Sequence, residues 1–494
     1  MGLFLTLISA IFYYFSFPPH TQGYSAFISL TPFLFALSKT ESVKQSFLLG
    51  QFWGLIISII LSVPLYNALV TEYDLSIFFS SLLIIISVYI PYAIIYGFFG
   101  ISYRYFFIKN TVYIPVIAAS LWMLIDYVMT ITPVFLPWGF YGYSQTFTPF
   151  IQIADITGIY GVTFFLVLIN SVLCSIFYYK KKYLKTNIFI IILITCSLTL
   201  YGYNRKDNIT GIINSSNNKT IKASVIQGNF NSNEKWNSKN TAAILNTYIN
   251  MSKQVIDESD IIVWPETVLN SNDKDNLSVI TGLSSALKDN QLFIAGATRN
   301  DLSSRTFNSI LTADKNGLCY IYDKKILFPF TETSFAGLSS GKFMDSPAIF
   351  NPGMTRPVYK SGLIDIGYTI CFESIYPDYV RRIKNSGALV LINTSNDSWF
   401  GYTYQPYMHM YSSIVRGIEN RIYVIRSSNS GISAIISPDG EIIKYIDLNV
   451  RDKITASIKP LKIESFYSKT GDWIVILAVV IIMFFLIFNV KKTE

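Results

Sequence analysis

The uneven distribution of charge along the 494 residues constrains the fold more than any other feature. Residues 1–203 carry 13 of the 70 charged side chains, and residues 204–494 carry the other 57. Charged residues make up only 14% of the whole chain and apolar residues 51%, whereas a soluble domain has about 25% charged residues. We therefore predict that the first two-fifths of the chain lies in a membrane and that most of the remainder is surrounded by water.

Eight apolar segments, separated by short polar loops, account for this pattern. A membrane-spanning helix needs about 20 apolar residues, with a range of roughly 17–25, and the first two segments are short enough to suggest a tilted or hairpin pair. The N-terminal segment lacks a basic region and a small-residue cleavage site, so we do not expect a signal peptide. The segments are 2–17, 24–38, 46–70, 76–103, 111–131, 159–179, 187–203 and 473–490.

The loops between these segments predict their orientation. The short loops 18–23, 71–75 and 132–158 contain no Lys or Arg. Positive residues near helix ends remain in the cytoplasm, which predicts that both termini are cytoplasmic and that residues 204–472 lie outside. The alternate loops and the C-terminus hold ten basic residues, which are Lys39, Lys44, Arg104, Lys109, Lys180, Lys181, Lys182, Lys185, Lys491 and Lys492.

The more polar part of the chain reads as a linker followed by a soluble domain. Residues 204–220 are rich in Asn and Ser, which is typical of a polar linker. Over residues 221–460, short apolar runs occur with helical patterns between some of them, which predicts a layered α/β domain. The predicted strands are 221–227, 260–266, 291–297, 361–373, 388–396 and 423–431, and the predicted helices include 239–257, 275–289 and 405–421.

Several polar, reactive side chains fall at or near the ends of these strands. Glu266 ends one strand, Cys371 and Glu373 end another, and Lys324 and Glu332 lie between them in the sequence. Residues at strand ends in layered α/β domains point into the crevice where ligands bind. A thiolate nucleophile, a carboxylate that takes its proton and a cation that holds an oxyanion form a sufficient set for covalent catalysis.

Each of these residues also has an ordinary structural explanation. A lone Cys in a strand is usually a small buried hydrophobe, Glu266 after Trp-Pro fits a cap or the surface, and Lys324 beside Lys325 fits a solvated position. Four cysteines argue against a disulfide scaffold, and the wide separation of His20 and His409 argues against a histidine-based metal site. We do not take the net charge of +8 as a sign of nucleic-acid binding, because ten of the basic residues lie in short loops between apolar segments or at the C-terminus.

Four blocks, WPET, YDKKILFPFTE, YTICFES and NTSNDSWFG, occur in an order that resembles the nitrilase (carbon-nitrogen hydrolase) superfamily. With seven apolar segments before them and one after, the chain resembles the apolipoprotein N-acyltransferases over nearly its whole length. The resemblance implies a membrane domain of seven helices at 1–203, a nitrilase-like αββα sandwich at 221–460 and a C-terminal transmembrane helix at 473–490. It also implies a multi-pass protein of the bacterial inner membrane with a periplasmic catalytic domain.

The resemblance assigns roles to residues that match the family motifs. Glu266 resembles the general base, Lys324 the catalytic lysine and Cys371 the nucleophile. Four further residues match supporting positions of the family, and these are Glu332, Glu373, Trp236 and Asn308.

Three positions depart from the family pattern. Thr331 stands where the family usually has Gly, and Phe372 stands where it usually has Tyr. Phe372 cannot donate a hydroxyl hydrogen bond. Asp126 is the one charge in the stretch where the family usually carries a glutamate and an arginine. None of these departures affects the triad.

The resemblance implies the last step of lipoprotein maturation. An acyl chain passes from a phospholipid resembling phosphatidylethanolamine to Cys371 as a thioester, and then to the α-amino group of the diacylglyceryl-cysteine of an apolipoprotein. The partners are therefore lipids, lipoproteins and the membrane, and neither a metal, a cofactor nor nucleic acid is implied. A membrane-tethered amidase or hydrolase with the same triad is the alternative, and a transporter or sensor would show paired intramembrane charges.

Residues 399–410 have an unusual composition. In twelve residues they hold five aromatic side chains, two methionines and no Lys, Arg, Asp or Glu. Trp and Tyr prefer the headgroup level of a bilayer, so we predict a lid at the bilayer surface that gates lipid entry to Cys371. A rigid core loop is the alternative. The predicted lid residues are Trp399, Phe400, Tyr402 and Tyr404.

Overall fold

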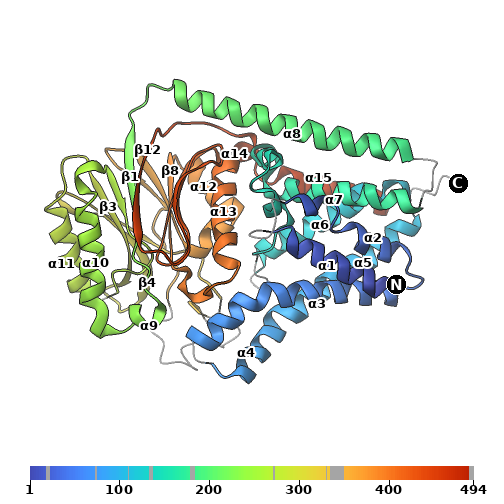
Figure 1. Cartoon of the computed structure of the whole chain (residues 1–494), viewed down its shortest axis with the longest axis horizontal. Helices are drawn as coiled ribbons and strands as arrows, with labels where there is room; N and C mark the ends of the chain where they lie inside the picture. Colours follow the sequence, from blue (N-terminus) through green and yellow to red (C-terminus); the bar gives the residue numbers. More distant parts are fainter. Residues whose placement is uncertain are drawn as a thin grey trace. The chain divides into compact units, whose positions relative to one another are not determined.

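The structure is a computed structural model that describes residues 1–17, 23–72, 75–109, 111–132, 137–178, 184–270, 273–329, 331–333 and 350–488. The chain divides into two compact units, one helical and one built from helices and strands (Figure 1). The helical unit comprises Met1–Tyr66, Ile77–Asn208 and Thr470–Glu494, and the α/β unit comprises Asn67–Ser76 and Ile209–Lys469.

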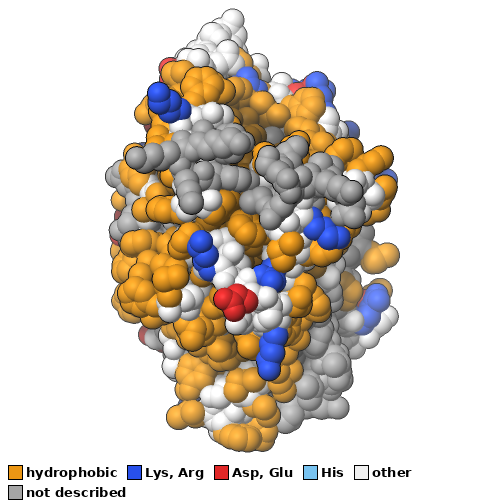
Figure 2. Space-filling model, turned by 90° about the vertical axis from the view of Figure 1, so that its right-hand side faces the viewer, with side chains coloured by type: hydrophobic (Ala, Val, Ile, Leu, Met, Phe, Trp, Pro, Cys, Tyr) orange, Lys and Arg blue, Asp and Glu red, His pale blue; other side chains and the backbone are white. Residues whose placement is uncertain are grey.

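Each of the eight predicted apolar segments contains a helix. Five helical stretches in the described residues are long and apolar enough to cross a membrane, and three apolar helices are shorter. Figure 2 shows a face on which hydrophobic side chains predominate and Lys and Arg side chains are scattered among them. The chain is therefore a multi-pass membrane protein. Its apolar helices are α1 (Gly2–Phe15), α2 (Thr31–Ser38), α3 (Val43–Asn67), α4 (Ile77–Ile84), α5 (Ile90–Lys109), α6 (Ile114–Ile131), α7 (Ala154–Tyr178), α8 (Leu184–Ser215) and α15 (Trp473–Ile487).

Small residues allow two of these helices to pack closely. Gly50 and Gly54 of α3 are four residues apart, and a Cβ atom on either would collide with the main-chain carbonyl of Tyr96 or Tyr92 on α5. Close backbone approach at such positions is a main source of helix association in lipid, because lipid tails remove the hydrophobic driving force between helices. Asp126 on α6 is buried and accepts a hydrogen bond of 2.9 Å from the Thr163 hydroxyl, so this intramembrane carboxyl has a partner.

The predicted linker at 204–220 is largely wrong. Helix α8 continues to Ser215, so only residues 216–220 separate it from the first strand. The segment contains no proline, and adding residues to an existing helix is far easier than starting a new one. Ile209 is fully buried, which anchors this polar extension through one apolar side chain.

The α/β unit contains two six-stranded sheets. Their strand orders are β12-β1-β2-β3-β4-β5 and β11-β10-β9-β8-β7-β6. Three central strands of each sheet run parallel and the flanking strands pair antiparallel. The strands are β1 (Ile221–Gln227), β2 (Ile261–Val263), β3 (Leu292–Asn300), β4 (Thr306–Asp314), β5 (Gly317–Asp323), β6 (Val358–Lys360), β7 (Asp365–Ile370), β8 (Val390–Ser395), β9 (Tyr423–Ser428), β10 (Ser433–Ile436), β11 (Ile442–Ile446) and β12 (Asp452–Ile458).

The two sheets pack face to face between layers of helices (Figure 1). Ile, Val and Tyr side chains of both sheets form the buried layer between them. Helices α10 (Thr241–Lys253) and α11 (Asp273–Ser284) cover the outer face of the first sheet. Helices α12 (Pro377–Asn385) and α13 (Gln405–Asn420) contact strands of the second. The predicted αββα sandwich is therefore confirmed, and its paired sheets bring the ends of several strands to one site.

Candidate active site

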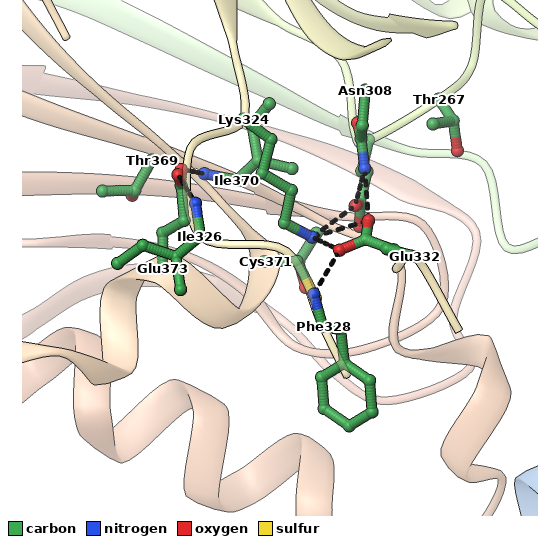
Figure 3. Close-up of polar contacts among 12 residues, drawn as sticks. Thr267, Asn308, Lys324, Ile326, Phe328, Glu332, Thr369, Ile370, Cys371 and Glu373 are labelled. Carbon is green, nitrogen blue, oxygen red and sulfur yellow. Dashed lines mark hydrogen bonds and ion pairs between the residues drawn. The ribbon is translucent and has the colours of Figure 1, made fainter. Parts of the chain in front are cut away.

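The predicted reactive residues converge at the ends of strands from both sheets. Glu266 follows β2 and Lys324 follows β5, while Cys371 follows β7 of the opposite sheet. Asn308 comes from β4, and Glu332 comes from the segment after Lys324. Figure 3 shows Asn308, Lys324 and Glu332 meeting beside Cys371. Distant parts of the sequence thus supply one cluster.

Lys324 is the centre of the buried charges. Its Nζ lies 2.8 Å from Glu332 Oε1 and Oε2 and 3.6 Å from Glu266 Oε1, and its side chain is 1% exposed. The Asn308 amide donates to both carboxylates, at 2.7 Å to Glu266 and 2.9 Å to Glu332. The Phe328 amide donates to the other oxygen of Glu332 at 2.7 Å. These bonds fix both carboxylates relative to the ammonium group.

Cys371 sits on a strained turn. Its φ of 48° lies in the left-handed region, which costs a non-glycine residue about 1–3 kcal/mol. The residue directly follows strand β7 and begins a short 3-10 helix, Cys371–Ile375. The turn therefore presents the thiol at the end of the strand, and surrounding contacts must hold it there.

Glu373 supplies those contacts. Its buried carboxylate accepts hydrogen bonds from the Tyr322 hydroxyl at 2.7 and 2.8 Å and from the amides of Lys325 at 2.7 Å, Ile326 at 3.1 Å and Ile370 at 2.8 Å. The amide donors come from the segment after Lys324 and from the strand before Cys371, as Figure 3 shows for Ile326 and Ile370, and the Tyr322 hydroxyl comes from β5. Glu373 thus ties the segment that carries Lys324 to the turn that carries Cys371.

Burial controls the proton affinities at this site. Burial raises the pKa of Glu266, against the opposing effect of Lys324. Burial likewise raises the pKa of the Cys371 thiol, and the Glu266 carboxylate adds to this effect. Although burial alone would lower it, the carboxylates of Glu332 and Glu266 hold the pKa of Lys324 above its ordinary value. The resting site therefore contains a neutral thiol, an ammonium group and a carboxylate with increased affinity for a proton.

The aromatic segment predicted as a lid divides into two parts. Gly401 and Tyr402 are exposed, Tyr402 at 87%, and Trp399 and Tyr404 are half-buried. Helix α13 begins at Gln405, so the second half of residues 399–410 is a buried helical turn. Pro406 stands in the first turn of that helix, where its missing N–H has no intrahelical role. Phe400 is also buried and packs edge-on against the His409 ring at 5.6 Å.

Trp236, the remaining predicted residue, lies beside this segment. Its ring centroid is 6.5 Å from that of Trp399. Phe372, where the family has Tyr, is buried with its ring edge-on to Phe328 at 4.9 Å and to Tyr376 at 5.1 Å. In this chain the position therefore contributes aromatic packing.

Sequence reasoning missed a second buried polar cluster beside Cys371. Asp397 accepts bonds of 2.6 Å from Arg426 and 3.0 Å from His409 Nδ1. Its carboxylate and the His409 imidazole lie within 4.8 Å of the Cys371 sulfur, the one such group of potential metal ligands among the described residues. Arg426 already compensates the charge of Asp397, and Ser395 and Ser428 also donate to it. The carboxylate is thus poorly suited to a cation.

Comparison with known proteins agrees with this architecture. Residues 9–172 match the family described as apolipoprotein N-acyltransferase N-terminal domain, and residues 222–467 match the carbon-nitrogen hydrolase family. The apolipoprotein N-acyltransferase of Rickettsia bellii (strain RML369-C) is 32% identical over 409 residues, which cover 78% of each chain. The chain belongs to the apolipoprotein N-acyltransferase family. The resemblance seen in the sequence, and the class of enzyme that it implied, are confirmed.

One further relative matches nearly the whole chain, and one solved structure matches about half of it. The apolipoprotein N-acyltransferase of Wigglesworthia glossinidia brevipalpis is 26% identical over 488 residues, or 96% of this chain and 95% of that protein. The nitrilase-superfamily protein Nit3 of Saccharomyces cerevisiae aligns with a TM-score of 0.41 and 17% identity, over 51% of this chain and 95% of Nit3.

Proposed function

We propose that the chain moves an acyl group from a membrane phospholipid to the α-amino group of the diacylglyceryl-cysteine of apolipoproteins. The observation that carries this proposal is the buried pair of Glu266 and Lys324 beside the half-buried Cys371 in a multi-pass membrane protein. Both substrates are lipids held in a bilayer. A membrane-embedded enzyme can meet them there.

In the first half-reaction, Cys371 acts as the nucleophile. Glu266 takes the proton from its sulfur, and the sulfur attacks the ester carbonyl of the phospholipid. The Lys324 ammonium and the Phe372 amide stabilise the oxyanion, and one such donor is typically worth about 2.7–4 kcal/mol. The C–O bond then breaks, Glu266 returns its proton to the departing alkoxide, and the lysophospholipid leaves a thioester on Cys371.

In the second half-reaction, the free α-amino group attacks this thioester. Glu266 accepts the proton of the amine as the C–N bond forms, and Lys324 again stabilises the oxyanion. The C–S bond breaks, and the proton on Glu266 returns to the Cys371 sulfur. The products are an N-acylated lipoprotein and the resting thiol. Glu332 and Asn308 keep the lysine and the base aligned during both steps.

The location follows from the loop charges rather than from the site. The ten basic residues in alternate loops and at the C-terminus favour cytoplasmic termini and a catalytic domain outside the cytoplasm. In a bacterium with two membranes this corresponds to the periplasmic side of the inner membrane.

The test is to incubate the purified protein with phospholipid that carries a labelled acyl chain. We expect a labelled protein adduct that hydroxylamine removes and that a diacylglyceryl peptide with a free amine discharges. Cys371→Ser should abolish the adduct, because a serine hydroxyl has no accessible anionic form at neutral pH. Cys319→Ser, which alters a cysteine on β5, is the matched control and should retain it. Release of free fatty acid, with no transfer to the peptide, would instead support the hydrolase alternative.

A further inference from the structure

The charges that surround the base include a lysine outside the predicted triad. Glu266 and Glu332 supply two buried carboxylates, whereas Lys324 supplies one ammonium group. Lys235, on the short helix Ser232–Lys235, is buried with 3% exposure. Its positive charge lowers the pKa of Glu266, and the negative charges of Glu266 and Cys371 raise the pKa of Lys235 in return. With this second ammonium group, two cations act on the two carboxylates Glu266 and Glu332.

Lys235 contacts the main chain that carries the base. Its Nζ donates to the Glu266 carbonyl at 2.8 Å and to the Thr267 hydroxyl at 2.7 Å. Asn270 donates to the Lys235 carbonyl at 2.8 Å, which closes the turn from the other side. Thr267 has a φ of 48°, an outlier for a β-branched residue. The lysine therefore stabilises a strained turn that aims the Glu266 side chain.

We propose that Lys235 is a positioning residue for the reaction, which supplies the second buried cation and keeps Glu266 ionised and aimed at the Cys371 thiol. This rests on the proposed function only in taking Glu266 as the base. Without this cation, two carboxylates would share one ammonium group, and the cluster would take up a proton. A protonated Glu266 cannot accept the proton of the thiol.

Charged groups around the base and the thiol determine whether Glu266 is ionised. Lys324 favours the ionised form of Glu266, and Glu332 opposes it. Asp397 acts on Cys371 from the other side, and its own charge is compensated by Arg426. Burial lowers the pKa of Lys235 to about 8, so it is mostly charged at pH 7, and its pull lowers the pKa of Glu266. Removing it must therefore raise the pH at which the base ionises.

The test measures the alkylation of Cys371 by iodoacetamide as a function of pH, read by mass spectrometry of its peptide in the full-length protein. Lys235→Met removes the charge and both hydrogen bonds, Lys235→Gln keeps a donor without the charge, and Lys235→Arg keeps both. Lys239→Met, at an exposed lysine four residues on, is the control. The alkylation rate should rise with pH as Glu266 ionises. In the Met and Gln variants we expect this rise to occur at a pH higher by about one unit or more. In the Arg variant and the Lys239→Met control it should occur near the wild-type pH.

The outcomes separate the charge from packing. The proposal would be overturned if the alkylation rate of the Lys235→Gln protein rose at the wild-type pH. It would also be overturned if the Lys235→Met protein melted at a lower temperature but kept the wild-type pH dependence. If the Met variant does not fold, the Gln and Arg variants still distinguish loss of charge from loss of packing. Alkylation needs no lipid, so the two proposals can fail separately. If the pH dependence of alkylation shifts as expected but the wild-type protein forms no acyl adduct, the acyl transfer is refuted and the role of Lys235 is retained.

Discussion

Replacing Lys324 with methionine should make the stability of this protein depend on pH. The substitution keeps an unbranched side chain of similar length but leaves Glu266 and Glu332 buried without the ammonium group 3.6 and 2.8 Å away. Removing one partner of a buried ion pair typically costs about 3–5 kcal/mol. The pair avoids part of that cost by binding a proton, since a buried carboxyl is far more stable when neutral.

The direction of the pH dependence follows from which state binds the extra proton. Burial raises the pKa of Glu266, and removing the opposing ammonium group raises it further, so the folded variant holds a proton at a pH at which the unfolded chain has lost it. The loss of stability is therefore small at acidic pH and grows as the pH rises. At pH 8 it should approach about 3–5 kcal/mol, which for a domain of this size lowers the melting temperature by roughly 12 °C relative to the wild type, and at pH 5 the fall should be clearly smaller.

Thermal melting of the detergent-solubilised protein at the two pH values checks this, together with formation of the acyl adduct, which should be lost at both. Lys325→Met is the matched control, because Lys325 contacts Glu373 through its main-chain amide and the substitution preserves that bond. A Lys324→Met protein that melts equally far below the wild type at pH 5 and pH 8 would refute the electrostatic reasoning and point to packing alone.

Three other predictions concern separate parts of the molecule. Glu373→Gln places an amide donor among donors, so it should cost about 1–3 kcal/mol in thermal melting and lower the rate of acylation; full activity would contradict its positioning role. A reporter active only in the cytoplasm should give no signal when fused at Ser215 and should give signal after Lys492, and the reverse pattern would refute the orientation. Tyr402→Ser should change stability by less than about 0.5 kcal/mol but slow acylation from bilayer lipid, whereas Phe400→Ala should cost about 3–5 kcal/mol. If the Tyr402→Ser and Phe400→Ala variants had the same melting temperature, the segment would not consist of an exposed part and a buried part.

Much of the fold could be predicted from the sequence because its signals are local. The strand predicted at 221–227 matches β1 residue for residue, and all of its residues except Lys222 are buried. Flanking strands gave no such signal: β11 is mostly exposed, and its alternation is too weak to separate it from a loop. The helical structure of residues 204–215 was not predicted, because the prediction relied on their polar composition. The apolar helix before them continues into this polar segment as far as Ser215.

The candidate site was predictable where motif and chemistry coincide. Glu266, Lys324 and Cys371 lie in blocks whose order resembles a known superfamily, and the structure brings them together. Lys235 was missed because it acts on a main-chain carbonyl, which leaves no trace in a side-chain motif. His409 reaches Asp397 only because helix α13 returns the chain to that carboxylate twelve residues later, which composition alone cannot show.

In the proposed mechanism, the total charge of the site stays constant during the reaction, which would allow the chemistry to proceed away from bulk water. Before attack, the negative charge rests on Glu266 and the Cys371 thiol is neutral, in keeping with the raised pKa of that thiol. When the thiol transfers its proton to Glu266 and attacks, the carboxylate becomes neutral and the charge appears on the oxyanion instead. Lys324 is within reach of both positions in the proposed mechanism, so it exchanges one anionic partner for another while Glu332 still orients it. The total charge stays constant, and no water is needed to solvate a new ion. Exclusion of water in turn favours transfer of the acyl chain to an amine over its hydrolysis.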